Sequence, residues 1–367
     1  MIEWIFIAFV SIILIGYMIF ALTLNNGVSS APRRILPYPT FTLDSSITVD
    51  NPGGNYGTQL SLRSGLCSVT QPTFEVDNGR VYVVDIENMT NKFTVVDGVS
   101  GDFFGGYAQL SWSASYVSVS QVGSLAVYNL SPTTLHSTLT PAVGNSSTVV
   151  GASSAWSKND AQLIYENTQT DASTWNYVTE IYPEDLGGQS TTRDTIRPGL
   201  TSMQTTQNGK LYGKDGDTLV EYTWINGTYL NRTEILDDCF TFVVSDNGTY
   251  LTSYDGDSAI HVFVNRDGTW QSAGTVSGVA EVTAMAMTQN GGYVAVAFGN
   301  SDTVHVYFRG LGDDLYGPQI INHLGGGDFG TDVALSHNES GEIIMMVGAP
   351  ASDSNKGVVY KYTMIAS

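Results

Sequence analysis

Histidines are the first side chains to test for chemistry, because an imidazole titrates near neutral pH and binds metals. The chain has five, at His136, His261, His305, His323 and His337. His261 and His305 occupy the same position in two similar segments, SAIHVF and DTVHVY. Two further segments of this kind carry Tyr82 and Tyr360 at that position. Exchange with tyrosine indicates a half-buried packing position for both histidines, with a metal site as the alternative.

Sequence motifs of known enzyme classes give no better lead. The chain contains no GxSxG, HExxH or P-loop motif, and no GxGxxG in a βαβ context. Asp328, Phe329 and Gly330 spell the kinase DFG triplet, but no glycine-rich loop or HRD segment accompanies it. Six short segments are expected to surround a central axis, and they carry mainly Thr, Ser, Gln and small apolar residues, without a convergent titratable set. They are TQLSL, AQLSW, TSMQTT, TFVVSD, TAMAMT and TDVALS. We therefore expect no catalytic residues, no cofactor and no enzyme activity.

Two cysteines, Cys67 and Cys239, are too few for a disulfide framework and lie in no zinc-binding spacing. They are interpreted as two buried thiols, with a single long-range disulfide as the alternative. The charge balance is more informative: the chain has 35 acidic and 15 basic side chains, for a net charge of −20. A surface of this sign repels nucleic acid, so no nucleic-acid partner is expected.

An uncharged apolar run, WIFIAFVSIILIGYMIFALTL, extends from residue 4 to 24. Its 21 residues would reach about 32 Å as a helix, enough to cross the hydrocarbon core of a membrane. A cleaved signal peptide would need a basic start, whereas the only early charge is Glu3. We therefore predict a transmembrane signal-anchor helix in residues 1–24, a linker in residues 25–34 and a single-pass membrane protein.

The side of the membrane is open on sequence evidence alone. Arg33 and Arg34 follow the apolar run, and the positive-inside rule would keep the rest of the chain cytosolic. Against that stand the N-x-[S/T] sequons, which are candidate glycosylation sites on an extracytoplasmic surface. They lie at Asn88, Asn129, Asn145, Asn226, Asn231, Asn247 and Asn338. The sequons weakly favour an extracytoplasmic domain, and a virion membrane is the other location that we consider.

A repeat organises the rest of the chain. Short alternating strands ending in an aromatic residue or Val recur about every 46 residues, on the scale of one four-stranded propeller blade. The repeats are GRVYVV, GSLAVY, DAQLIY, DTLVEY, SAIHVF, DTVHVY and GVVYKY. The sequence therefore predicts an all-β fold, a seven-bladed β-propeller in residues 35–367. Residues 182–198 lengthen one interval and are predicted to be an inserted surface loop.

The last repeat ends near the C-terminus and leaves no room for an outer strand. Residues 35–43, ILPYPTFTL, have no other place in the pattern, and their two prolines suit an edge strand. We expect this N-terminal strand to complete the last blade and close the ring.

Three repeats resemble the FG-GAP repeats of integrin α-chain-type propellers. The last repeat carries Phe329-Gly330, VGAP at residues 347–350 and GVVYKY, while Tyr56-Gly57 and Phe104-Gly105 open weaker copies. The resemblance implies a ligand-binding or scaffolding propeller. Many FG-GAP blades also bind calcium through alternating acids, but the matching turns here, SDNGT, TQNGG and SHNESG, are short or poor in acids. They are interpreted as polar hairpin turns, with calcium as the alternative.

These observations favour a non-catalytic, membrane-anchored interaction or adhesion module that binds a protein or glycan partner on a propeller face. A structural component of a virion or envelope lattice is the second hypothesis. A propeller hydrolase or lyase is the third.

Overall fold

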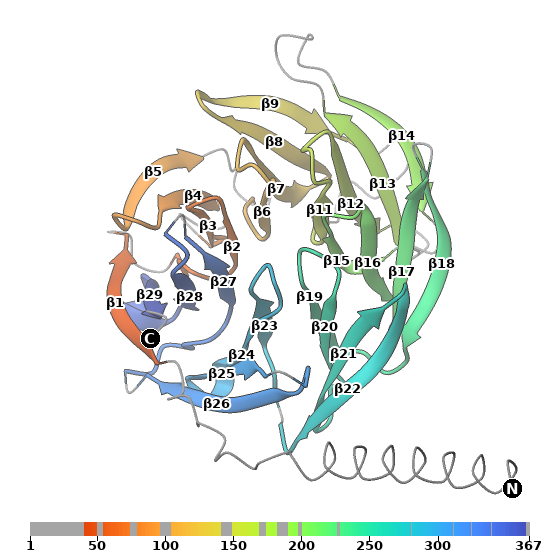
Figure 1. Cartoon of the computed structure of the whole chain (residues 1–367). Coiled ribbons are helices and arrows are strands. Elements are labelled where there is room, and N and C mark those ends of the chain that lie inside the picture. The colour runs from red at the N-terminus through yellow and green to blue at the C-terminus, as the bar shows by residue number, and fades with distance from the viewer. Residues whose placement is uncertain are drawn as a thin grey trace, which may run out of the picture. The chain divides into compact units, whose positions relative to one another are not determined.

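The computed structural model describes residues 40–49, 54–73, 79–95, 104–140, 149–168, 174–181, 190–196, 200–225, 228–279, 281–310, 312–323, 325–338 and 340–364. The chain divides into two compact units, Met1–Tyr38 and Pro39–Ser367, and the described residues all belong to the second. This second unit consists of short β-strands joined by turns and loops (Figure 1).

The described strands pair into seven sheets, six with four strands and one with five. The first contains β2 (Leu60–Arg63), β3 (Leu66–Gln71), β4 (Arg80–Asp85) and β5 (Thr90–Val95). The second contains β6 (Ala108–Leu110), β7 (Tyr116–Val122), β8 (Ser124–Leu130) and β9 (Thr133–Leu139), with β10 (Val149–Val150) beside β7. The third contains β11 (Ser154–Trp156), β12 (Gln162–Thr168), β13 (Thr174–Ile181) and β14 (Ser190–Ile196).

The remaining sheets repeat this four-strand pattern. The fourth contains β15 (Thr201–Thr205), β16 (Lys210–Asp215), β17 (Thr218–Ile225) and β18 (Thr228–Leu236). The fifth contains β19 (Thr241–Val244), β20 (Tyr250–Tyr254), β21 (Ala259–Arg266) and β22 (Thr269–Ser277). The sixth contains β23 (Ala284–Met287), β24 (Tyr293–Phe298), β25 (Thr303–Arg309) and β26 (Leu315–Asn322). The last contains β27 (Val333–His337), β28 (Ile343–Ala349), β29 (Val358–Met364) and β1 (Phe41–Thr48).

The sheets form a closed ring, because the innermost strand of each contacts the innermost strand of the next. The contacts run from β2 through β6, β11, β15, β19 and β23 to β27, and β27 contacts β2 again. Each sheet is antiparallel and extends outward from its innermost strand (Figure 1). Radial repetition of four-stranded antiparallel sheets around a centre is the architecture of a β-propeller.

The strand that completes the last sheet is β1. It pairs with β29 from Phe41 opposite Met364 to Thr48 opposite Val358. The position differs from the expected strand at residues 35–43, of which only residues 40–43 are described. The prolines of the expected strand lack the N–H groups that a sheet uses, whereas the residues of β1 can all donate. An N-terminal strand therefore completes the last sheet as predicted, but its described bounds are Phe41–Thr48 and overlap the expected strand only at residues 41–43.

Aromatic–glycine pairs occupy equivalent positions in three sheets. The aromatic rings of Tyr56, Phe104 and Phe329 are fully buried. The following glycines, Gly57, Gly105 and Gly330, have φ values of 94°, 74° and 91°. Each glycine N–H donates to a carbonyl of the second strand in its own sheet, at distances of 2.9–3.0 Å. The pairs thus fix the approach of the chain to the innermost strand, where a positive φ favours glycine.

The third sheet departs from the expected alignment. DAQLIY was predicted to be the same strand as GRVYVV and GSLAVY, but its residues form β12, the second strand of its sheet rather than the third. The stretch at residues 182–198, predicted to be an inserted loop, contains β14, which pairs with β13 as the outer strand. Repeats aligned on an apolar strand ending in an aromatic residue cannot separate second from third strands, because both are buried and alternate.

The predicted fold class also needs correction, because it placed a transmembrane helix before the propeller. The apolar run at residues 4–24 lies outside the described residues. Among the residues that are described, no helix is long and apolar enough to cross a membrane. The helices found there are the single turns η2 (Gly299–Ser301) and α2 (Ser352–Asn355). The fold is an all-β propeller, and the predicted single-pass membrane localisation, extracytoplasmic or virion, is wrong on the same finding.

Candidate binding site at the axial channel

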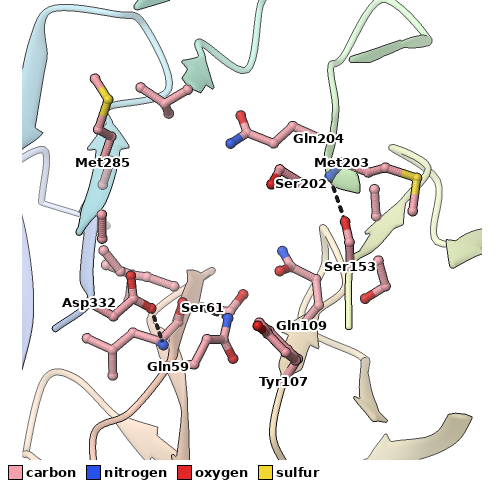
Figure 2. A pocket seen from close by; sticks show the side chains of 18 of the residues that line it. Gln59, Ser61, Tyr107, Gln109, Ser153, Ser202, Met203, Gln204, Met285 and Asp332 are labelled. Atoms are coloured by element: carbon pink, nitrogen blue, oxygen red, sulfur yellow. Dashed lines mark hydrogen bonds between the residues drawn. The ribbon is translucent and has the colours of Figure 1, made fainter. Parts of the chain in front are cut away.

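A cavity of about 790 Å³ follows the axis of the ring. All seven innermost strands or the residues next to them line it, and polar side chains project into it (Figure 2). Because these strands all run in the same direction, the cavity has two distinct mouths. We call the end at which they begin the start face, marked by Tyr107, Phe240 and Asp332. The opposite end, marked by Trp112 and Asp246, is the end face.

Several polar side chains of the channel connect one sheet to the next. In each case a side-chain oxygen on one innermost strand accepts a backbone N–H from its neighbour. The pairs are Gln59 with Ala108 at 2.8 Å, Ser61 with Leu110 at 3.2 Å, Ser153 with Met203 at 2.7 Å, Gln204 with Val244 at 3.0 Å, and Asp332 with Leu60 at 2.6 Å. The polar lining thus has a structural function. The innermost strands pair only within their own sheets, and these side chains bind the backbone N–H groups on the other edge of each strand.

Asp332 is the most constrained carboxyl group of the channel. One of its oxygens accepts the N–H of Leu60, and the other accepts its neighbour Val333 N–H at 2.8 Å. Burial raises the pKa of Asp332 to about 7, against the opposing effect of these two donors. Since both oxygens already accept a backbone proton, Asp332 acts as a connector between the last and first sheets.

Glu166 differs from Asp332. It lies in β12 at the start face, where its N–H donates to Ser153 O at 3.0 Å and its carbonyl accepts from Gly151 at 2.8 Å. Its side chain lines the cavity, and no ion pair or hydrogen bond from another described side chain reaches its carboxyl group. Burial raises the pKa of Glu166 to about 7. This group therefore titrates close to neutral pH in a cavity that is open to a ligand.

The end face carries an ion pair across the channel. Arg63 is the last residue of β2 and donates from Nη1 to both carboxylate oxygens of Asp246, at 3.2 and 3.1 Å. The guanidinium carbon lies 4.6 Å from the centre of the Trp112 ring. Trp112 in turn donates from Nε1 to the carbonyl of Trp156 at 2.8 Å. A cation, a carboxylate and an indole thus bridge this mouth.

A second cavity of about 490 Å³ opens on the start face between the fourth and fifth sheets. Phe240, with 57% of its surface exposed, lies in its wall. Lys214 donates to the carbonyl of Phe240 at 2.9 Å and stands 5.7 Å from the ring centre. Five carboxylates, those of Asp217, Asp237, Asp238, Asp255 and Asp257, line most of the rest, together with Leu236, Cys239 and His261.

Searches with the sequence find no relative: no protein-family model matches the chain, and no curated protein does. Solved structures are similar in fold. The Myceliophteria thermophila Cps50 (Swd1) β-propeller domain is 11% identical, with a TM-score of 0.62, over 88% of this chain and 99% of that one. A chain in the crystal structure of the mitotic checkpoint complex is 13% identical, with a TM-score of 0.63, over 90% and 98%. These similarities show a β-propeller fold.

The histidines and cysteines do not gather at the channel. Burial against Phe298, whose ring centre is 4.5 Å away, lowers the pKa of His305. His261 Nε2 lies 3.5 Å from an Asp255 oxygen at the second cavity. Cys67 and Cys239 are both buried free thiols, in separate hydrophobic clusters. Among the described residues, no group of three or more His, Cys, Asp or Glu side chains could hold a metal ion.

The polar turns expected in place of calcium loops are internally hydrogen-bonded. Asn247 Oδ1 accepts from Ser245 Oγ at 2.7 Å and from Thr249 N–H at 3.0 Å. Asn290 accepts in the same way from Thr288 at 2.9 Å and from Gly292 at 3.0 Å. The side-chain oxygens of Asn247 and Asn290 therefore form hydrogen bonds within their own turns.

The described sequons lie on or near turns at the end face. Asn88, Asn231 and Asn247 are exposed. Asn129 is 9% exposed and donates to Thr134, while the amide of Asn338 donates to Glu342 at 2.8 Å. The two remaining candidates, Asn145 and Asn226, lie outside the described residues. Glycosylation of all seven stays a prediction.

The channel residues were only partly visible in the sequence. Asp332 belongs to TDVALS, one of the segments expected around the axis, and its position just before the strand was the available signal. Glu166 was missed because its strand was aligned one place too far out. The pairing of Arg63 with Asp246 had no sequence signal, since it depends on the curvature of the ring.

Proposed function

We propose that the protein is a non-catalytic interaction module that binds a protein partner on its start face. Five large hydrophobic side chains are notably exposed among the described residues: Leu43, Tyr107, Leu135, Phe240 and Ile320. Three of these lie on outer strands at the rim of the ring. Tyr107 and Phe240 are the other two, and both lie on the start face.

The exposure of Tyr107 and Phe240 is the observation that carries this proposal. Tyr107 is 48% exposed beside the channel mouth, and Phe240 is 57% exposed beside the second cavity. Exposed aromatic side chains are enriched at protein interfaces, where they supply much of the binding energy. The end face offers no comparable residue among those described, and its mouth is bridged by the Arg63–Asp246 pair.

The charges around these aromatics favour a partner with basic groups. Five aspartates line the cavity beside Phe240, with Lys214 as the nearby cation. Complementary charge steers association and suppresses wrong partners. The same sign opposes nucleic acid, in agreement with the net charge of −20. A protein partner is therefore preferred to a glycan, which would gain nothing from this charge.

The alternative functions have less support. A hydrolase or lyase would have Glu166 as its one candidate acid or base among the described channel residues, because both oxygens of Asp332 accept backbone N–H groups and Asp246 is paired with Arg63. A lattice component has no specific support among the described contacts. Membership of the FG-GAP family rests on three aromatic–glycine pairs and remains a prediction.

The test is affinity capture with matched variants from the cells that make the protein. Tyr107→Ser combined with Phe240→Ser removes both start-face aromatics. Leu135→Ser combined with Ile320→Ser removes two similarly exposed side chains from the rim and is the control. The proposal expects the same partner to be retained by the wild-type and control chains and lost by the first variant, with melting temperatures checked for both. Equal retention by all three chains would refute it.

A further inference from the structure

The open mouth of the channel combines a carboxyl group with an aromatic ring. Glu166 and Tyr107 come from neighbouring sheets, and both line the cavity of about 790 Å³. Tyr107 is half exposed, and the carboxyl group of Glu166 meets no partner among the described side chains. A carboxylate and an aromatic ring that line one cavity can together recognise an organic cation, through ion pairing and cation–π attraction.

The remaining charges of the cavity leave Glu166 as the group available to a cation. Arg63 and Asp246 neutralise each other at the end face. Asp332 uses both oxygens to bind backbone N–H groups. No other Lys, Arg, His, Asp or Glu lines this cavity, and the side chains of β13, next to Glu166, lie outside the described set.

Neutral acceptors and donors surround the same space. Gln109 and Ser202 project into the channel from the second and fourth sheets (Figure 2). An alkylammonium has three donors that rotate freely, so one carboxylate with scattered amide and hydroxyl acceptors suits it. A guanidinium can pair with a carboxylate through two parallel hydrogen bonds and is therefore the competing cation that the experiment must compare.

We propose that the start-face mouth of the channel binds a primary alkylammonium group, with Glu166 as its counter-ion and Tyr107 against its alkyl chain. This inference rests on the proposed interaction function and names the chemistry that it recognises. The ammonium can belong to a lysine side chain of a protein partner or to a free amine. A lysine from a partner docked on the start face would reach this mouth between the two exposed aromatics.

Ligand-observed NMR titration of the whole protein tests the proposal, because it detects weak binding. The probes are n-butylammonium, n-butylguanidinium, n-butanol and a capped Gly-Gly-Lys-Gly-Gly peptide. We expect n-butylammonium to bind at pH 8 and its affinity to fall about tenfold at pH 5.5, where Glu166 takes up a proton. Peptide binding tighter than that of the free amine identifies a partner's lysine as the source, and the reverse order identifies a free amine.

Two variants complete the design. Glu166→Gln keeps the shape and removes the charge, and about a tenfold loss of n-butylammonium affinity is expected at pH 8. Glu87→Gln makes the same change at an exposed turn of the end face and should leave affinity unchanged. Equal affinity of wild type and Glu166→Gln overturns the assignment, and so does binding of n-butanol or n-butylguanidinium as tight as that of n-butylammonium.

The two proposals fail separately. Absence of amine binding with start-face capture of the partner intact means that the ammonium site is wrong and the interaction face stands. Amine binding with no dependence of capture on Tyr107 and Phe240 means that the channel site stands without the interaction face.

Discussion

Arg63 and Asp246 lie 183 residues apart in the sequence, yet their side chains meet at 3.1 Å across the axial channel. Arg63 ends the innermost strand of the first sheet, and Asp246 follows that of the fifth. Three sheets therefore separate them on one side of the ring and two on the other. The contact forms only when all the sheets have assembled into the closed ring. It joins opposite sides of the fold and bridges the end face.

Breaking this pair is predicted to destabilise the ring. Arg63→Met or Asp246→Asn leaves the other group without its partner at a site where the two side chains are only 24% and 11% exposed. Each change should lower the free energy of unfolding by about 1–2 kcal/mol. The measurement is denaturant unfolding of both single variants and the double variant, at one salt concentration.

The control is the exposed pair of Arg232 with Glu234, whose carboxylate side chain is 62% exposed. Its coupling energy should lie within about 0.5 kcal/mol of zero. For Arg63 and Asp246 the double-mutant cycle should give a coupling of about 1 kcal/mol. Strictly additive effects would show that the two groups do not interact in solution.

Glu166→Gln is predicted to stabilise the protein at alkaline pH. The pKa of Glu166 is raised by burial from 4.5 to about 7, so the folded state holds a proton that the unfolded state has released between these values. The wild-type chain therefore loses stability as the pH rises from about 4.5 to 7, and Gln does not ionise. The variant should exceed wild type by about 1–2 kcal/mol at pH 8 and match it near pH 4. A pH series of unfolding curves checks this, and a difference independent of pH would contradict it.

Gly348→Ala is predicted to be among the most disruptive small changes. A Cβ at Gly348 would lie 2.0 Å from the carbonyl oxygen of Gly57 in the first sheet. Relief requires the two sheets to separate, at about 2–3 kcal/mol. Gly312→Ala, whose new atom would meet Asp314 at an ordinary 3.7 Å, is the control and should be nearly neutral. Melting temperatures of the two variants within a degree of each other would rule out this close approach.

Removal of β1 is predicted to open the ring. Phe41 is 5% exposed, its N–H donates to Gln319 at 2.8 Å, and Asp44 accepts from Lys361 at 2.7 Å. A chain that begins at residue 50 loses these contacts and bares the edge of β29, so it should be less stable by about 3 kcal/mol or more and aggregate more readily. A chain that begins at residue 40 is the control. Identical unfolding curves for the two chains would exclude β1 as the closing strand.

Much of the strand pattern could be predicted, because it depends on local features. GRVYVV and DTVHVY are short segments rich in Val and Tyr next to turns that contain Asn and Gly, and they form β4 and β25. TQLSL and TDVALS were placed around the axis, where β2 and β27 lie. These strands depend on residues that lie close together in the sequence, so a single sequence is enough to predict them.

Other features could not be predicted from the sequence. The register of the third sheet failed because β12 and a third strand have the same burial pattern, and only their partners distinguish them. The closing strand was placed too early because the prolines of ILPYP were taken as an edge signal, while the pairing of β1 with β29 joins residues more than 300 positions apart. The transmembrane assignment used the length of the apolar run, its lack of charge and the absence of a basic start, which state what a segment can span and not where it lies.

Site-specific photo-crosslinking tests the central claim most directly. A photo-reactive amino acid is placed singly at Tyr107, Phe240, Leu135 or Ile320, and the protein is irradiated in the cells that make it. The account predicts a covalent adduct with one protein partner from positions 107 and 240, and none with that partner from rim positions 135 and 320. Adducts of equal yield from all four positions, or from the rim positions alone, would contradict a partner that binds on the start face.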